Sequence, residues 1–502
     1  MVDYHYIVVG GGTAGCVIAA RLSEQPDARV LLLEAGSAER TRAMTVPNAW
    51  PQNLGSAAEW GNRTAPQADA GPVIIPRGKA LGGSSAINAM AHIRGHSAVY
   101  DGWAASGATG WGFSDLLPYF KRSERTEGRD SALRGTDGPI RVGPALDRHP
   151  VAEALARELV AAGYPRTDDL SGQHQEGACW VDLAIANGER VSAADGYLRP
   201  VLDRQNLIVE TDSLATRLSV RDGRCTGVSY LRDGKTTEAL ASGEVILCAG
   251  SIGSPQLLML SGIGPASPLR ALGIDVLADI PGVGSNLQDH PIVLTSYASL
   301  EQLAVSDYNN GEMYAALRSE FAGSIPDLHL FPILLPLAPA ALQAPETGFA
   351  LVAGLMAPDS AGSVRLAAAD PLAAPVIDQG FLTEGRDTDR LEAGIGIVRR
   401  AAAGDAFAAF RKAEIWPGLD VDSGTGLRDY IRRNVESYYH PVGTCRLGPD
   451  PDAVVDLQLR VRGVTGLRVA DASVIPTIPN ANPNATVLAI AERAADMIRS
   501  GS

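Results

Sequence analysis

The sequence predicts an α/β fold that begins with a βαβ unit and continues into a second domain. Three observations support this prediction. Residues 4–9 (YHYIVV) have the apolar, β-branched and aromatic character of a buried strand. A glycine turn, a helical stretch over 13–24 and a second apolar strand ending at Glu34 follow in order. The length of 502 residues also exceeds one ordinary domain, so more than one core is expected.

Composition and charge disfavour several classes of function. Apolar residues make up 45% of the chain and charged residues 20%, which is ordinary for a globular enzyme. The 43 Lys and Arg against 57 Asp and Glu give a net charge of −14, which disfavours nucleic acid and anionic membranes as partners. The chain opens with neither a basic segment nor an apolar run of about 18 residues. We therefore expect a soluble, cytoplasmic protein.

The cysteines argue against a disulfide framework and against a metal centre. They are odd in number, scattered, and never in a CxxC pair, so neither a set of disulfides nor a zinc site is expected. Cys445 is interpreted as a small buried residue in a turn rather than a nucleophile. The five positions are Cys16, Cys179, Cys225, Cys248 and Cys445.

The first glycine turn carries a dinucleotide-binding pattern. Gly10, Gly12 and Gly15 form GxGxxG between the first strand and the helix, and Glu34 follows 19 residues after Gly15. Such glycines let backbone N–H groups approach a pyrophosphate at the positive end of a helix, while the acid accepts bonds from a ribose. The pattern predicts a dinucleotide site, as opposed to a tight turn without a ligand. Further cofactor contacts are expected at Thr13, Ala14 and Ala35.

Later segments favour a flavin over a nicotinamide nucleotide. A second glycine cluster, RGKALGGSSAIN at 77–88, supplies further backbone donors and small side chains. The run LRVADASVIP places Asp471 and Ser473 at the end of a late strand, within expected reach of a ribityl or pyrophosphate group. The final NATVLAIAERAADMIRS has helical spacing, with Asn484 able to cap it. One cofactor served by both ends of the chain suits a large, permanently bound flavin.

The middle of the chain predicts a separate domain. Residues 293–432 are rich in Pro and Ala, have few glycine loops, and contain strand patterns such as DLHLF and SVRL. We interpret this segment as part of a substrate-binding domain.

Several motifs together resemble those of the glucose–methanol–choline (GMC) oxidoreductases. They are GKALGGSSAINAMAHIRG (78–95), GSIGSPQLLMLSGIG (250–264), GVGSNLQDHP (282–291), YYHPVGTCRLG (438–448) and the C-terminal NANPNATVLAIAERAADMI. The resemblance covers essentially the whole chain. It implies an α/β fold, α+β overall, with a Rossmann-like FAD-binding domain and a substrate domain built on a large antiparallel sheet. The expected division is 1–155, 196–292 and 433–502 for FAD binding, and 156–195 and 293–432 for substrate binding.

The same resemblance implies residue roles. His440 matches the active-site histidine of the family, and Asn482, followed by Pro483, matches its second active-site position. Ile87 stands where some relatives carry a histidine that links FAD covalently, so non-covalent FAD is expected, and His92 is offset from that position. Further cofactor contacts are implied at Gly82, Gly83, Ser84, Ser85, Asn88, Ala89, Leu214, Asp471, Ala472, Asn482 and Pro483.

These residues suit the oxidation of an alcohol. A neutral histidine can take the hydroxyl proton, and an amide or imidazolium donor can stabilise the developing alkoxide. The hydride then goes to flavin N5. We therefore predict His440 as the base and Asn482 as the group that positions the substrate oxygen. The alternative for His440 is a buried structural histidine, and the alternative for Asn482 is a loop or capping role. A metal site at His440 is not supported, because no second ligand lies at a suitable spacing.

Four other residues are possible parts of the pocket. His290, in NLQDHP, is interpreted as holding its loop rather than acting as a base or metal ligand. His329 lies on an expected strand and either lines the pocket or packs. Tyr438 and Tyr439 either shape the substrate pocket or serve packing.

The substrate is left as a class. Short segments such as RGHSAVYDGW resemble primary-alcohol oxidases and dehydrogenases of the hydroxymethylfurfural oxidase, pyridoxine 4-oxidase and choline dehydrogenase types. The chain is short for the family, which favours a small primary alcohol, aryl, heterocyclic or choline-like. Choline requires an anionic or aromatic cage, for which Glu301, Asp307 and Glu312 are candidates.

Several alternatives stay open at this stage. A flavin-containing hydroxynitrile lyase would use acid–base chemistry, although Asn482 in place of a second histidine disfavours it, and a binding protein with a structural nucleotide is a third possibility. The electron acceptor is O2 or a quinone, and the assembly is a monomer or a dimer.

Overall fold

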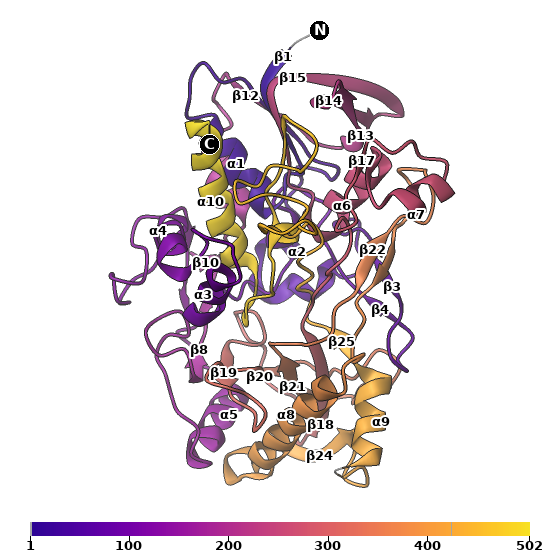
Figure 1. Cartoon of the computed structure of the whole chain (residues 1–502). Helices are drawn as coiled ribbons and strands as arrows, with labels where there is room; N and C mark the ends of the chain where they lie inside the picture. The colour runs from indigo at the N-terminus through magenta and orange to yellow at the C-terminus, as the bar shows by residue number, and fades with distance from the viewer. Residues whose placement is uncertain (1–2, 423, 502) are drawn as a thin grey trace.

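Two seven-stranded sheets lie one above the other along the long axis of the molecule (Figure 1). A computed structural model describes residues 3–422 and 424–501. The upper sheet contains the N-terminal strand, and the lower sheet is built mainly from the middle of the chain. Helix and sheet therefore mix as the sequence predicts, and the α/β fold class is confirmed.

The upper sheet is parallel at its centre and antiparallel at one edge. Its strand order is β12-β2-β1-β15-β14-β13, with β26 paired to β15. β1, β2, β12, β15 and β26 pair in parallel, whereas β13 and β14 form an antiparallel extension. The bounds are β1 (Asp3–Val9), β2 (Val30–Leu33), β12 (Leu207–Glu210), β13 (Leu214–Arg221), β14 (Arg224–Arg232), β15 (Lys235–Leu247) and β26 (Leu467–Val469).

The first turn of the chain requires glycine. β1 ends at Val9, and helix α1 (Thr13–Leu22) begins after the turn. Gly10 has a φ of 102°, and a Cβ there would lie 2.6 Å from the Cys248 carbonyl oxygen. A Cβ on Gly15 would lie 1.8 Å from the Gly10 oxygen, so helix and turn could not pack together. The predicted strand, turn, helix and strand are all observed.

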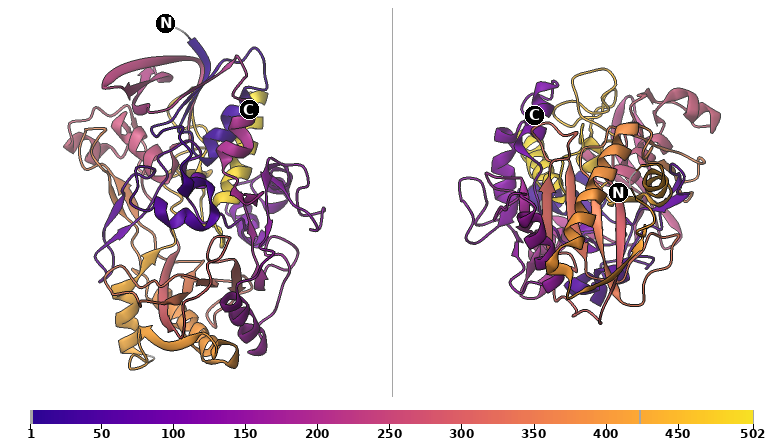
Figure 2. Two further views of the ribbon diagram at one scale, coloured as in Figure 1. Left: turned by 180° about the vertical axis from the view of Figure 1, so that it is seen from behind. Right: turned by 90° about the horizontal axis from the view of Figure 1, so that it is seen from below.

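The lower sheet is antiparallel throughout. Its order is β24-β18-β21-β20-β19-β8, with β25 paired to β18. Helices α5 (Pro150–Ala161), α8 (Gly385–Ala403) and α9 (Thr425–Asn434) pack on one face (Figure 2). The strands are β8 (Gly177–Trp180), β18 (Pro291–Ser299), β19 (Met313–Leu317), β20 (Leu328–Ile333), β21 (Gly348–Leu355), β24 (Arg411–Trp416) and β25 (Glu436–Ser437).

The opposite face of the lower sheet looks toward the upper half of the molecule. Because side chains alternate along a strand, one set packs under the helices and the other forms a second apolar cluster. This second cluster includes Tyr314, Phe331 and Val352 from the sheet, and Ala91 and Ala481 from the upper half. The sheet therefore forms the floor of the region between the two halves.

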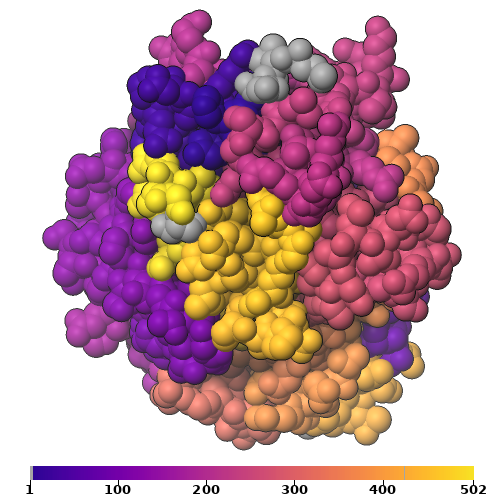
Figure 3. Space-filling view, turned by 45° about the horizontal axis from the view of Figure 1, so that its top comes forward, coloured from indigo at the N-terminus to yellow at the C-terminus, as the bar shows by residue number. Residues whose placement is uncertain are grey.

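The C-terminal helix α10 (Asn484–Ser500) packs against α1 and α4 (Phe113–Ser123). Figure 3 shows the C-terminal segment, in yellow, between the N-terminal segment and residues near 250–280. The expected capping by Asn484 is wrong: Pro483 holds the N-cap position, and no side chain caps the helix. The Asn484 Oδ1 atom instead accepts the Thr13 hydroxyl at 3.1 Å. This bond ties the two ends of the chain together beside the glycine turn.

Smaller elements connect the two halves. A four-stranded sheet joins β22 (Ser363–Arg365) and β23 (Val376–Asp378) to β3 (Arg63–Pro66) and β4 (Pro72–Ile74), so the predicted SVRL strand lies outside the large sheet. The predicted domain boundaries stay a proposal.

The remaining α-helices and strands are α2 (Arg42–Thr45), α3 (Ser97–Ala105), α6 (Gly250–Leu260), α7 (Ala266–Ala271), β5 (Glu124–Arg125), β6 (Ile140–Arg141), β7 (Gly143–Pro144), β9 (Asp182–Leu183), β10 (Ile185–Ala186), β11 (Glu189–Arg190), β16 (Ile263–Gly264) and β17 (Ala278–Asp279).

Over residues 3–422 and 424–501, no helix is both long and apolar enough to span a membrane. All five cysteines are free and buried, including Cys445.

Candidate active site

His440 lies between two polar partners that come from distant parts of the chain. Its Nε2 atom is 3.1 Å from the Asn482 Nδ2 atom, and its Nδ1 atom is 2.9 Å from the Nδ1 atom of His290. His440 is 8% exposed and His290 is fully buried. The structure thus brings together the two predicted catalytic residues and adds His290, for which only a loop-holding role was expected.

Asp289 fixes the backbone of both histidines. Its Oδ1 atom accepts the backbone N–H of His290 and that of His440, each at 2.8 Å. Its Oδ2 atom accepts the Ser437 hydroxyl at 2.5 Å and the Gln379 amide. Burial raises the pKa of Asp289 to about 6, against the lowering effect of Ser437 and the backbone donors. One carboxylate therefore joins the NLQDHP loop to the YYHP segment.

The site disfavours positive charge on its imidazoles. Burial, followed by the charges of His290, Arg77 and His329, holds the pKa of His440 well below its ordinary value. Burial likewise lowers the pKa of His290 strongly, and that of His329 to about 3. All three rings are therefore neutral at pH 7, the state in which a histidine can accept a proton.

An aromatic wall leads from the lower sheet to His440. The Tyr438 ring stacks on Phe331, with centroids 5.1 Å apart, and lies 4.3 Å from the His440 ring. Tyr314 stacks on Phe331 at 4.8 Å and meets His329 edge-on at 5.8 Å. A stack of aromatic rings therefore lies beside the candidate base.

Four buried polar atoms near this wall have no hydrogen-bond partner among the described residues: Tyr438 Oη, Asn482 Oδ1, His329 Nδ1 and His290 Nε2. The Tyr438 hydroxyl faces Tyr314 and Asn482, and its pKa is raised by burial and by Tyr314. Buried polar groups normally have partners, so these atoms are available to a polar ligand. The predicted substrate-pocket roles of Tyr438 and His329 stay predictions.

Tyr439 makes no ring contact with this wall among the described residues, and its predicted pocket role stays a prediction. It has a φ of 66°, and its pKa is raised by burial and then by the carboxylates of Glu436, Asp289 and Glu59. Arg77 Nη1 donates to its carbonyl oxygen at 2.6 Å, and Arg77 Nε donates to Ser84 Oγ at 3.0 Å. Arg77 therefore connects the second glycine cluster to the residue before His440.

The two glycine clusters pack against each other and form the cradle expected for a nucleotide. The Gly82 N–H donates to the Gly11 oxygen at 2.7 Å, and a Cβ on Gly83 would lie 2.6 Å from the Gly12 Cα. The Glu34 carboxylate accepts the N–H groups of Gly11 and Gly36, each at 2.7 Å. Burial raises its pKa to about 7. The acid is thus fixed beside the turn, where it can accept from a ribose.

Other predicted cofactor residues support this cradle through their side chains. Asn88 Oδ1 accepts Arg190 Nη1 at 2.7 Å, and the Ser85 hydroxyl donates to the Gly82 oxygen at 2.6 Å. The Asp471 carboxylate accepts the Gly250 N–H, the Ser254 hydroxyl and both donors of Ser473. Leu214 is the first residue of β13. The backbone N–H of the residue before it, Ser213, donates to the backbone carbonyl oxygen of Glu34. Direct contacts of the side chains of Asp471 and Ser85 with a cofactor stay a prediction.

Ile87 is 6% exposed and offers no atom for a covalent link, so non-covalent attachment of a cofactor stays the expectation. His92 instead bonds Glu124 at 3.0 Å, within a buried ionic cluster. In the part of the chain that the structure describes, no three His, Cys, Asp or Glu side chains are grouped to hold a metal ion.

Family models described as GMC oxidoreductase match residues 4–292 and 358–491. The chain belongs to the GMC oxidoreductase family. Mitochondrial choline dehydrogenase of Homo sapiens is 38% identical over 99% of this chain and 90% of the relative. Oxygen-dependent choline dehydrogenase of Photobacterium profundum is 37% identical, over 99% of this chain and 93% of the relative.

Solved structures agree with this assignment. Pyridoxine 4-oxidase from Mesorbium loti has a TM-score of 0.95 and 35% identity, and the match covers 98% of this chain and 99% of that one. A formate oxidase variant from Aspergillus oryzae has a TM-score of 0.92 and 28% identity, covering 100% and 99% of the two chains. This GMC chain is an FAD-dependent alcohol oxidoreductase, and the glycine cradle and Glu34 fit its cofactor.

Sequence reasoning missed several residues at the site. Arg77, Asp289, Tyr314 and Phe331 all lie within the contacts described above, and only Tyr314 stood outside the motifs and strand patterns already singled out. Tyr314 and Phe331 could have been found from the alternation of side chains on neighbouring strands.

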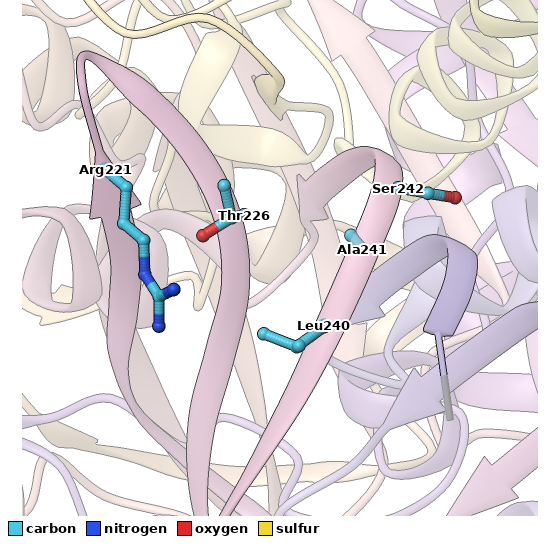
Figure 4. Close-up of a pocket in the computed structure, with 5 residues that line it drawn as sticks. All are labelled: Arg221, Thr226, Leu240, Ala241 and Ser242. Atoms are coloured by element: carbon cyan, nitrogen blue, oxygen red, sulfur yellow. The ribbon is translucent and has the colours of Figure 1, made fainter. Parts of the chain in front are cut away.

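A separate small cavity of about 190 Å³ lies on strands β13, β14 and β15 and contains none of these residues (Figure 4).

Proposed function

We propose that this GMC oxidoreductase oxidises a small aryl or heterocyclic primary alcohol to its aldehyde, with His440 as the base. The observation that carries the proposal is the neutral His440, whose Nε2 atom faces Asn482 beside a wall of aromatic rings. Bound FAD supplies the acceptor for the hydride. The protein residues hold the alcohol, take its proton and exclude water.

The proton step is assigned to two side chains. The Nε2 lone pair of His440 takes the hydroxyl proton, because burial keeps this imidazole neutral. The Asn482 amide, 3.1 Å from Nε2, holds the substrate oxygen and donates to the charge that develops on it. Both groups are fixed before substrate arrives, so little reorganisation is required.

The aromatic residues beside His440 favour a neutral aromatic substrate. Tyr438, Phe331 and Tyr314 form one stack of rings, and an aryl or heterocyclic group can make edge-to-face contacts with it. The three lowered imidazole pKa values mark a region that disfavours positive charge. The pyridoxine 4-oxidase neighbour is named for a heterocyclic alcohol, which agrees with this substrate class.

A choline-like alcohol is the second candidate, because the relatives of this chain include choline dehydrogenases and aromatic rings can contact an ammonium group. The carboxylates considered for such a cage do not favour it. Glu301 and Asp307 are exposed, and the buried Glu312 lies 3.5 Å from the Ser306 hydroxyl. We therefore rank the neutral alcohols first.

The test is anaerobic mixing of the FAD-loaded protein with benzyl alcohol, pyridinemethanols, choline and unbranched primary alcohols. Bleaching of the flavin absorbance by the aromatic alcohols, with slower bleaching by choline, is the expected result. His440→Ala should slow the reduction by about 10²–10⁴-fold. Failure of every primary alcohol to bleach the flavin would refute the proposal, and cyanohydrin cleavage without bleaching would indicate a lyase.

Admitting air to the reduced protein then distinguishes the two acceptors. Rapid return of the flavin colour indicates O2, whereas slow return that a quinone accelerates indicates a dehydrogenase. Cytoplasmic location and a monomeric or dimeric assembly stay predictions, the latter checked by light scattering.

A further inference from the structure

The contact between His290 and His440 contains one proton. Two Nδ1 atoms 2.9 Å apart cannot both present lone pairs, because the lone pairs would repel, and cannot both carry hydrogen. One nitrogen must donate and the other must accept. The direction of this bond decides which nitrogen of His440 is free to act as a base.

The partner of Nε2 sets the direction. The Asn482 Nδ2 group is a donor, so the Nε2 atom of His440, 3.1 Å away, accepts. A neutral imidazole carries one hydrogen, which therefore sits on Nδ1 and points to His290. The Nδ1 atom of His290 accepts it, and the hydrogen of His290 is left on Nε2.

The buried setting of His290 leaves His440 as the partner of its ring. The ring is fully buried, and its Nε2 atom has no hydrogen-bond partner among the described residues. Its backbone N–H is held by Asp289 Oδ1, which also holds the backbone N–H of His440. The two rings meet nearly perpendicular, at 89°. Asp289 therefore fixes the two backbones relative to each other.

We propose that His290 is a positioning residue that fixes the tautomer of His440. By accepting the Nδ1 hydrogen, it keeps the lone pair of His440 on Nε2, where the alcohol arrives. When the hydroxyl O–H bond breaks and the Nε2–H bond forms, the Nδ1 hydrogen stays in place, directed at the His290 lone pair. This inference rests on the proposed role of His440 as base.

Other charged and titratable groups surround the pair. His329 and Arg77 act on His440 as positive or potentially positive neighbours, Asp289 lies beneath both backbones, and the Tyr438 ring covers one side. None of them contacts the Nδ1 atom of His440 at hydrogen-bond distance in the described structure. His290 is thus the residue that can set the tautomer.

Two substitutions of His290 test whether its ring acts as a hydrogen-bond acceptor or only fills buried space. His290→Asn places Oδ1 close to the position of the lost Nδ1 atom and can still accept, whereas His290→Ala cannot. His149→Asn is the matched control: His149 is also buried, its Nδ1 atom accepts the Val151 N–H as a helix cap, and it lies outside the site.

We expect His290→Ala to lower the rate constant of anaerobic flavin reduction by about 10- to 100-fold, less than loss of the base itself. The dissociation constant of the alcohol and the FAD spectrum should stay unchanged. His290→Asn should stay within about threefold of the parent protein, as should His149→Asn. A His290→Ala protein that reduces its flavin at the parent rate would overturn the proposal, as would a His290→Asn protein as slow as His290→Ala.

A direct measurement covers the case in which His290→Ala does not fold. The FAD-loaded parent protein is labelled with ¹⁵N-histidine, and the His440 signals are assigned by their loss in His440→Ala. Protonated Nδ1 and unprotonated Nε2 are expected. Hydrogen on Nε2 would overturn the inference, whatever the variants do. Full flavin reduction by His440→Ala would instead overturn the proposed base while leaving the measured tautomer intact.

Discussion

Replacing Asn482 by Asp tests the electrostatics of the site most directly. The substitution changes the shape of the side chain little, but it puts a carboxylate where an amide now stands 3.1 Å from His440 Nε2. The His440 pKa is held well below its ordinary value, first by burial and then by three positive or potentially positive neighbours. An adjacent negative charge opposes these effects and favours the imidazolium.

The magnitude follows from the distance. With charge centres roughly 4 Å apart and an effective dielectric constant of about 20, the attraction is about 4 kcal/mol. At about 1.4 kcal/mol per unit, the pKa of His440 rises by about three units. Even if the proton sits on the carboxylate, it is shared with Nε2. In either case the lone pair that takes the substrate proton is occupied near neutral pH.

The assay is stopped-flow flavin reduction without oxygen, measured from about pH 5 to pH 10 with the best alcohol of the substrate series. The parent protein needs neutral His440, so its rate constant should stay flat with falling pH until well below the ordinary histidine pKa of about 6.5. A raised pKa means protonation at higher pH, so the acid limb of Asn482→Asp should move upward by about three units.

Asn482→Leu is the matched control, because it removes the donor without adding charge. Its rate constant should fall by about 10²–10³-fold at every pH, with the acid limb unmoved. An Asn482→Asp profile that coincides with that of the parent protein would refute the assignment of His440 as the titrating base beside Asn482.

Three further predictions concern other contacts. Arg77→Met removes a positive neighbour of the base, so the acid limb of flavin reduction should move to higher pH, whereas Arg77→Lys should move it less. Glu124→Ala leaves Arg94 and Arg134 buried without their shared carboxylate, and should lower the free energy of unfolding by about 3–5 kcal/mol in urea titrations; an unchanged midpoint would contradict this. Tyr438→Ala removes the stacked ring beside the base and should weaken binding of aryl alcohols more than that of unbranched ones, as the dissociation constants from flavin reduction will report.

Local chemistry made much of the upper half predictable. The apolar run of β1, the glycine turn and α1 follow from side-chain period and from glycine requirements within about fifteen residues. Gly10 and Gly15 are required by backbone contacts in their own turn and at Cys248, which a GxGxxG pattern signals. The pairing of His440 with Asn482 was also accessible, through the motifs in which each stands.

The expected helix cap failed for a tertiary reason. Asn484 has the right chemistry for a cap, and by local preference alone it would be one. Its oxygen instead accepts a hydroxyl 471 residues away along the chain, at Thr13. A sequence pattern weighs only neighbouring residues, so it could not detect this competing donor.

The sequence alone predicted a dinucleotide site, more than one core, and a histidine and an asparagine suited to alcohol oxidation. Only the tertiary structure decided how that histidine is held. His290 meets His440 from 150 residues away, and Asp289 reaches across 151 residues to its backbone. These contacts follow from the antiparallel pairing of β18 with β25 in the lower sheet, which brings the residue before β18 beside the segment after β25. The proton on His440 is therefore set by folding distant strands together, because no local spacing specifies which nitrogen faces which partner.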